Sequence, residues 1–335
     1  MSKQRIIYFD IAKGILILFL LMGHALLFIK HEGVNDVFIN GFQKCRLYIW
    51  TAYYMPAFFV ITGYCTSFDK PFLPFLWKNI KTLKIPAIIF GTFLTLVTLV
   101  SHDKLTITNV TSHLSWCVID SGLWFLDALF ISKLCFWALQ RVTNNNYLIL
   151  IACLVLFAIG FLWYQEQKGD VTNIKHALML TFFLFFGQTL KASKYELLLE
   201  RYKYIPLVLY ILTTCCVLFW NLPYPYITNR MHLSWSSLLF FFLLSTTGSL
   251  LILQLSKRIE PNRILEYIGK NSLVFYIFNT FALNISVKLL SKYMTTTLNC
   301  VLLFIGTIVL TCCLLTIICY LLNTKYLKFT LGKDW

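Results

Sequence analysis

Ten long apolar segments, separated by short polar or charged stretches, dominate the sequence. Each has roughly 17–25 residues, the length that an α-helix needs to cross the roughly 30 Å hydrocarbon core of a bilayer. Within a bilayer the backbone N–H and C=O groups must be bonded inside the protein, so such segments fold as helices. They lie at residues 8–29, 47–67, 85–101, 122–141, 147–164, 176–191, 205–221, 233–255, 272–290 and 297–322.

The composition excludes an ordinary soluble domain. Hydrophobic residues make up 59% of the 335 positions and charged residues 13%, and the mean hydropathy is +0.73. Soluble globular proteins are far more polar. We therefore predict an all-α, polytopic membrane helix bundle with about ten transmembrane helices, built as a single integral-membrane domain over residues 1–335. The segment 102–121 is the least regular, and it can dip into the membrane without crossing it.

Basic residues are unevenly divided between the predicted loops. With the N-terminus inside, 19 Lys and Arg residues lie on the inner side and 9 on the outer side, and Lys133 lies within a segment. Cytoplasmic loops carry such an excess, so both termini are predicted to face the cytoplasm. The cations are scattered between apolar segments, which argues against nucleic-acid binding. The eleven cysteines have no metal-binding spacing, so no metal site is predicted.

Lys13 and His24 are the most informative polar residues of the first segment. Eleven steps of about 100° bring both side chains to one face of a helix, and the helical rise separates them by about 16.5 Å. They therefore lie at different depths of the membrane. An ionisable residue at depth is a functional candidate, although His24 can also be a neutral residue bonded to a neighbouring helix. Lys13 can pair with Asp10 or extend to the interface.

A catalytic partner for His24 has to come from another helix. Asp10 is excluded because fourteen helical residues place it about 21 Å away. Asp127 lies near the predicted outer end of the fourth segment, and His24 lies near the outer end of the first, so the two share a depth. We therefore expect His24 and Asp127 to be the catalytic residues, with Asp127 orienting the imidazole.

Cations also gather on the predicted cytoplasmic side. Lys78, Lys81 and Lys84 recur every third residue before the third segment. They either anchor the chain to anionic lipid or bind the phosphate groups of a ligand. Farther along, Gly269-Lys270-Asn271-Ser272 predicts a turn and the start of the ninth helix, whose N–H groups face the same side. We count Lys270 among the candidate phosphate-binding residues.

Four motifs follow one another along the chain: Arg5…Asp10-x-x-Lys13-Gly14…His24, Met55-Pro56-Ala57-Phe58-Phe59-Val60-Ile61-Thr62-Gly63-Tyr64, Leu123-Trp124-Phe125-Leu126 and Ile268-Gly269-Lys270-Asn271-Ser272-Leu273. In this order they resemble the acyltransferase-3 family of integral-membrane O-acyltransferases. The likeness is greatest to its stand-alone branch without a soluble domain, which includes fucose 4-O-acetylase-like proteins. A basic residue, ten spacers and a histidine in the first helix are the hallmark of this family.

This resemblance implies transfer of an acyl group, usually acetyl from cytoplasmic acetyl-CoA, to a hydroxyl of a cell-surface glycan or glycolipid. It implies that His24 is catalytic, that Lys13 engages the acyl donor, and that the series from Lys78 to Lys84 stands where the family carries a basic motif. Trp124 then belongs to an apolar sleeve around the donor's thin arm, or else packs at the membrane interface. Acyl-CoA is expected as a donor substrate, with no tightly bound cofactor.

Two departures from the family pattern stand out. Lysines occupy positions that are often arginine, which loses bidentate phosphate geometry. Asn279 stands where many relatives carry a histidine, so no acid–base role is expected there. The expected partners are acyl-CoA, a glycan or lipid-linked sugar acceptor and the lipid bilayer, in the bacterial cytoplasmic membrane. The main alternative is a transporter or flippase, which also uses intramembrane charges and proline-bearing helices, although the chain has no paired inverted halves.

Overall fold

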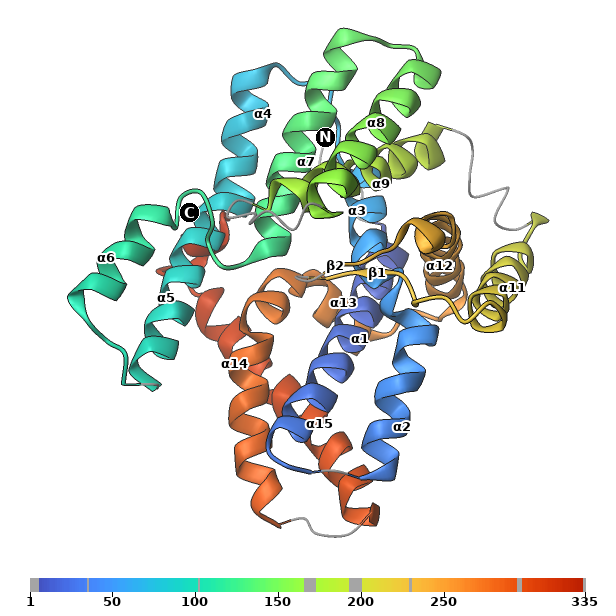
Figure 1. Cartoon of the computed structure of the whole chain (residues 1–335). Helices are drawn as coiled ribbons and strands as arrows, with labels where there is room; N and C mark the ends of the chain where they lie inside the picture. Colours follow the sequence, from blue (N-terminus) through green and yellow to red (C-terminus); the bar gives the residue numbers. More distant parts are fainter. Residues whose placement is uncertain are drawn as a thin grey trace. The chain divides into compact units, whose positions relative to one another are not determined.

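The computed structural model describes residues 6–34, 36–101, 103–165, 173–192, 201–228, 231–293 and 297–333, so Lys3 and Arg5 lie outside the described residues. Nearly all elements are helices, which confirms the predicted all-α class (Figure 1). The helices are α1 (Ile7–His31), α2 (Val37–Arg46), α3 (Tyr54–Cys65), α4 (Phe72–Asn79), α5 (Ile85–Ser101), α6 (Ile107–Trp116), α7 (Trp124–Val142), α8 (Asn146–Gln165), α9 (Ile174–Ala192), α11 (Ile205–Phe219), α12 (Leu238–Arg258), α13 (Arg263–Lys270), α14 (Ser272–Leu290) and α15 (Thr297–Leu322). A short antiparallel hairpin lies between α11 and α12, formed by β1 (Tyr226–Ile227) and β2 (Met231–His232).

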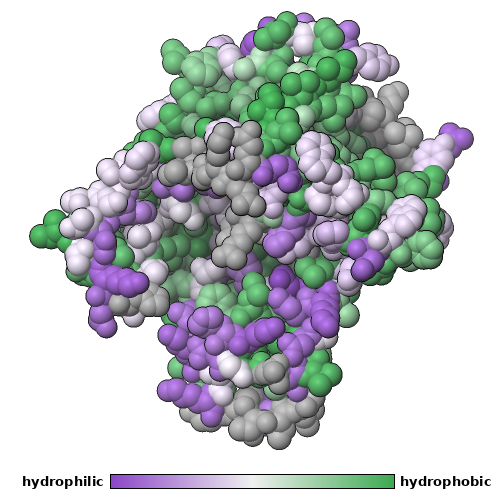
Figure 2. Space-filling model, in the orientation of Figure 1, coloured by the Kyte–Doolittle hydropathy of each residue, from purple (hydrophilic) through white to green (hydrophobic). Residues whose placement is uncertain are grey.

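Several helices are long and apolar enough to cross a membrane. In the described part of the chain there are six, at Ile7–His31, Phe72–Ser101, Asn146–Gln165, Trp235–Arg258, Ser272–Leu290 and Asn299–Leu322. α11 is apolar but shorter. Figure 2 shows a broad hydrophobic surface over α7 and α8, where the exposed side chains of α8 include Ile151 and Val155. This protein is therefore a multi-pass membrane protein.

The helices fall into two groups by their contacts. Unit 1 comprises Met1–Phe58 and Glu196–Leu321, and unit 2 comprises Phe59–Tyr195 and Leu322–Trp335. The expected single domain over the whole chain stays a prediction. Each unit is described by itself below.

In unit 1, α1 lies against α2, α12, α13 and α14 (Figure 1). Two glycines allow the closest of these approaches. A Cβ at Gly14 would collide with the backbone carbonyl of Leu265, and a Cβ at Gly269 would collide with the backbone carbonyl of Asp10. Small residues let helix backbones approach closely in a membrane, where helix association relies on packing. α13, an element that the sequence analysis missed, is thereby held against the first half of α1.

The segment 47–67 is not one continuous α-helix, so that prediction is wrong. A π-helical turn covers Leu47–Thr51, a turn follows, and α3 begins at Tyr54. Pro56 has no N–H to donate to the carbonyl of Ala52 four residues earlier. The hydroxyl of Ser245 in α12 donates to that carbonyl at 2.9 Å. The interrupted helix thus keeps this buried backbone group bonded, as the membrane interior requires.

In unit 2, the expected cytoplasmic loop 68–84 is also wrong. α4, a π-helical turn at Ile80–Lys84 and α5 form one helical run from Phe72 to Ser101. The π turn precedes Pro86, whose ring and missing N–H disturb a regular helix, and such turns absorb that disturbance. The side chains of Leu73 and Trp77 are 73% and 62% exposed, as for residues that face lipid. The lysines among these apolar residues made the segment polar enough to be predicted as a loop.

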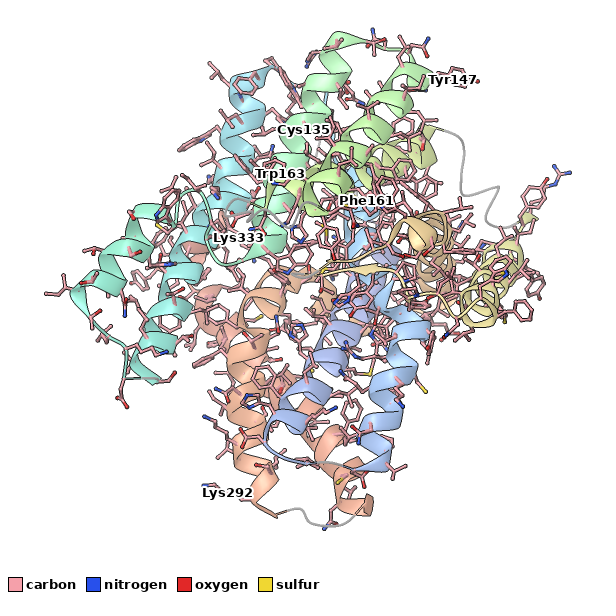
Figure 3. The ribbon with its side chains drawn as sticks, in the orientation of Figure 1. Cys135, Tyr147, Phe161, Trp163, Lys292 and Lys333 are labelled. Carbon is pink, nitrogen blue, oxygen red and sulfur yellow. The ribbon has the colours of Figure 1, made fainter. Side chains whose placement is uncertain are left out.

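The rest of unit 2 is a group of packed helices. α7, α8 and α9 lie together, and α8 buries Phe157 and Phe161, while Tyr147 at its start points away from its neighbours (Figure 3). At the end of α7, Arg141 donates to the backbone carbonyls of Asp69 and Lys70 at 2.7 and 2.8 Å. These bonds fix the chain just before α4 begins. α6, within the irregular segment 102–121, has ten residues, which are too few to cross a bilayer.

The glycine contact between α1 and α13 gives a stability prediction. Gly14→Ala should lower the thermal unfolding midpoint of the purified protein in detergent, because the added Cβ meets backbone atoms of Leu265 that cannot rotate away. Such overpacking costs about 1–3 kcal/mol. Gly41→Ala is the matched control, since nothing lies within 4 Å of its Cβ, and alanine favours a helix over glycine by about 1 kcal/mol. Equal midpoints for the two variants would contradict the packing described.

Candidate functional site

His24 of α1 has a defined partner in α14. Its Nδ1 lies 2.8 Å from Oδ1 of Asn279. The amide nitrogen of Asn279 donates to the backbone carbonyl of Tyr276, which fixes the direction of the amide because a carbonyl can only accept. Oδ1 is likewise only an acceptor, so Nδ1 of the histidine carries the hydrogen. In the neutral ring Nε2 therefore keeps its lone pair.

Nε2 of His24 is the reactive end of this arrangement. No described residue forms a hydrogen bond with Nε2, and the ring is partly exposed while Gly23 and Ala25 beside it are buried. The bond to Asn279 fits both interpretations from the sequence, a structural histidine and a reactive one. The unbonded Nε2 favours the reactive one, because it can take a proton or attack an electrophilic carbon.

Aromatic side chains lie along the same helix. Phe19 of α1 stacks on Trp50 with ring centroids 4.9 Å apart, and Tyr53 meets Phe19 edge-on at 6.5 Å. Behind them the hydroxyls of Tyr210 and Tyr224 lie 3.2 Å apart. Burial raises the pKa of Tyr224 to about 12, so its phenol stays protonated at neutral pH. Unit 1 thus packs aromatic rings, several of which carry hydroxyl groups, against Phe19 of α1.

The other end of α1 brings the predicted cations together. Nζ of Lys13 lies 3.6 Å from Oδ1 of Asp10, as the three-residue spacing predicts. The Lys13 side chain is 29% exposed, whereas the Asp10 side chain is buried. Gly269 packs on Asp10, and Lys270, the next residue, pairs with Glu266 at 3.1 Å. α14 starts at Ser272, which confirms the predicted helix start.

In unit 2, Asp127 is bonded to Lys84. Nζ of Lys84 lies 2.5 Å from Oδ1 of Asp127, and Oδ2 accepts from the backbone N–H and hydroxyl of Ser121 at 2.9 and 2.8 Å. The expectation that Lys84 lies at the cytoplasmic end and Asp127 near the outer end is therefore wrong, because the two share one depth. His24 belongs to the other unit, so its pairing with Asp127 stays a prediction.

The other predicted residues of unit 2 lie on three different elements. Lys78 is exposed on α4, and Lys81 is half-buried in the π turn that follows. Trp124 begins α7 and packs on the ring of His176, with centroids 5.2 Å apart. Their roles in donor binding stay predictions.

Two residues near His24 were not assigned a role from the sequence. Asn279 was noted only as a departure from a family pattern, although a polar amide within an apolar span is itself a signal of a buried hydrogen bond. Arg46, the last residue of α2, was counted only as an outer charge. A Cβ at Gly23 would lie 2.8 Å from Nη1 of Arg46, so this guanidinium lies beside His24.

The buried ion pair of unit 2 gives a second stability prediction. Lys84→Met should lower the free energy of unfolding by about 3–5 kcal/mol, because it leaves the Asp127 carboxylate buried without its cation. The double variant Lys84→Met/Asp127→Leu should regain much of that loss. Lys270→Met, which breaks the more exposed pair with Glu266, is the control and should cost at most about 1 kcal/mol. Thermal midpoints in detergent measure all three, and equal losses for the two single variants would refute the prediction.

Comparison with known proteins identifies the family. The acyltransferase-3 family model, an acyltransferase domain, matches residues 6–324. Nodulation protein NolL of Mesorhizobium japonicum is 30% identical over 151 residues, which are 44% of this chain and 38% of that protein. The match thus spans well under half of this relative's length, and no solved structure matches. Because the family model covers nearly the whole chain, this protein belongs to the acyltransferase-3 family.

Proposed function

We propose that this protein is an O-acetyltransferase that moves an acetyl group, or another acyl group, from cytoplasmic acyl-CoA to a hydroxyl of a cell-surface glycan or glycolipid precursor. The arrangement at His24 carries the proposal. Its bond to Asn279 leaves a basic Nε2 unbonded on an apolar helix. Acyl transfer to an alcohol needs a group that accepts a proton or the acyl group and then releases it.

Two routes use this nitrogen. As a general base, Nε2 takes the proton of the acceptor hydroxyl while the hydroxyl oxygen attacks the thioester carbon; the C–S bond then breaks, and the leaving thiolate takes the proton from the imidazolium. As a nucleophile, Nε2 attacks the thioester carbon itself and the thiolate leaves. The acceptor hydroxyl next attacks the acyl carbon, the bond from that carbon to Nε2 breaks, and the hydroxyl proton passes to the thiolate. The tautomer held by Asn279 serves both routes.

The donor's phosphate groups belong, in this proposal, near Lys13. Its side chain is partly exposed, and α13 brings Lys270 to the same end of α1. Lys78 and Lys81 are further candidates, whereas the charge of Lys84 is already matched by Asp127. The thin arm of coenzyme A then covers the rise of about 16.5 Å between Lys13 and His24.

The proposed topology has ten spans in the bacterial cytoplasmic membrane, with both termini inside. The six long apolar helices are completed by α3, α7, α9 and α11, each of which coincides with a predicted segment. Without Lys78, Lys81 and Lys84, which lie in the helical run from Phe72 to Ser101, 16 basic residues remain on the inner side against 9 on the outer side, and this excess supports the orientation. Lys13 then lies toward the cytoplasmic donor, and His24 toward the outer acceptor.

The central test uses purified protein in liposomes with labelled acetyl-CoA and a polysaccharide acceptor. Wild type should label the acceptor, and His24→Ala should reduce the rate by about 10²–10⁴-fold, the usual contribution of a catalytic acid–base group. His31→Ala, at the exposed end of the same helix, is the control and should keep the wild-type rate. Movement of substrate across the bilayer without covalent transfer would favour a transporter instead. An acyl group on His24, trapped by rapid quench without acceptor, would select the nucleophilic route.

Asn279 should matter through the orientation of His24. Asn279→Leu should lower kcat by about 10–100-fold, as losses of orienting partners of histidine generally do. Asn279→Asp should keep most of the rate, because it retains an acceptor oxygen at the same place. Ser286→Ala, which removes a buried hydroxyl lower on the same helix, controls for general disturbance of α14. A fully active Asn279→Leu variant would exclude the orienting role.

A further inference from the structure

Arg46 occupies an unusual position for a charged side chain. Its backbone carbonyl accepts a hydrogen bond from the hydroxyl of Thr51 at 3.0 Å. Its side chain is directed at α1, where a Cβ at Gly23 would lie 2.8 Å from Nη1 and 3.9 Å from Cζ. The guanidinium therefore lies against the backbone of the residue that precedes His24. A side chain at position 23 would displace the end of the Arg46 side chain from this place.

Among the described residues, this guanidinium has no neutralising partner. Over the residues that the structure describes, no carboxylate forms an ion pair with Arg46, and its Nε is buried without a hydrogen-bond partner. Its electrostatic neighbours are His24, Tyr54 and Tyr226. Arg46 as a whole is half-buried, and a partly desolvated cation without a counter-ion is a candidate site for an anion that forms or binds there. Lys84, in contrast, has its counter-ion in Asp127.

The reaction at His24 generates an anion. When Nε2 or the acceptor oxygen adds to the thioester carbon, the π bond of the carbonyl opens and its electron pair moves to the oxygen. When the tetrahedral species collapses, that pair re-forms the carbonyl and the C–S bond breaks. Fixed donors that meet this oxygen lower the barrier, most of all where water is scarce. Arginine is well suited to the task, because it stays charged and presents its N–H donors in a rigid plane.

We propose that Arg46 is a further catalytic residue, which binds the carbonyl oxygen of the acyl group and stabilises the oxyanion formed next to His24. This inference rests on the proposed function. Gly23 is then a positioning residue, since its missing side chain sets the place of the guanidinium. The hairpin contributes Tyr226, which stacks on His232 at 4.2 Å and lies in the electrostatic environment of Arg46.

The test measures kcat and KM for both substrates in the liposome assay with the full chain. Arg46→Gln should lower kcat by about 10²–10³-fold, as loss of an oxyanion donor does, with KM changed by less than about threefold. Arg46→Lys keeps the charge but lacks the rigid plane of N–H donors, so its kcat should lie between those of wild type and Arg46→Gln. Gly23→Ala should also lower kcat while the unfolding midpoint stays close to that of wild type, because the flexible end of Arg46 can yield. Lys44→Gln, an exposed cation on the same helix, should match wild type.

The outcomes separate this inference from the proposed function. If wild type transfers acyl groups and Arg46→Gln is equally active, the inference alone fails. It also fails if Arg46→Gln raises KM for the acceptor and keeps kcat, because Arg46 would then bind an anionic group of the acceptor. If wild type transfers no acyl group at all, the proposed function fails and the inference with it. A fall in kcat confined to the Arg46 and Gly23 variants supports it.

Discussion

The contact between α1 and α13 is the constraint on which the arrangement of unit 1 depends. Helices in lipid gain little from hydrophobic burial against each other, so close backbone packing has to hold them. Gly14 and Gly269 provide that approach from the two sides. Because a single residue, Asn271, separates α13 from α14, the docking of α13 also determines where α14 begins. The contact of α13 near Asp10 therefore also sets the position of Asn279, the partner of His24 on α14.

Two partly buried cations differ in how the cost of their desolvation is met. Lys84 is neutralised by Asp127, and the second oxygen of this carboxylate also accepts a hydrogen bond. Both oxygens of Asp127 thus have partners, which suits a structural role. Arg46 has no such partner among the described residues, and its Nε is buried without a hydrogen bond. One charge is thus neutralised within the fold, and the other, in our proposal, stabilises the oxyanion formed in the reaction.

The sequence predicted the helices better than their interruptions and partners. Apolar length alone placed a helix at each of the ten segments, because the bilayer permits little else. It failed at 68–84, where lysines are spread along an otherwise apolar helix, and at 47–67, where Pro56 interrupts the hydrogen-bond pattern. Contacts between residues far apart in the sequence were harder to predict. The loop expected at 68–84 hid the pairing of Lys84 with Asp127, and the bond of His24 to Asn279 depends on side chains 255 positions apart.

The ion pair of Lys84 and Asp127 also bears on how the protein is made. The two residues are 43 positions apart, so the helix that carries the lysine emerges from the ribosome before its counter-ion has been synthesised. A lone lysine or aspartate at the centre of a membrane helix opposes insertion by about 2.5–3.5 kcal/mol. The bond between Lys84 and Asp127 therefore forms only after α7 has been made, and until then the lysine lacks this counter-ion.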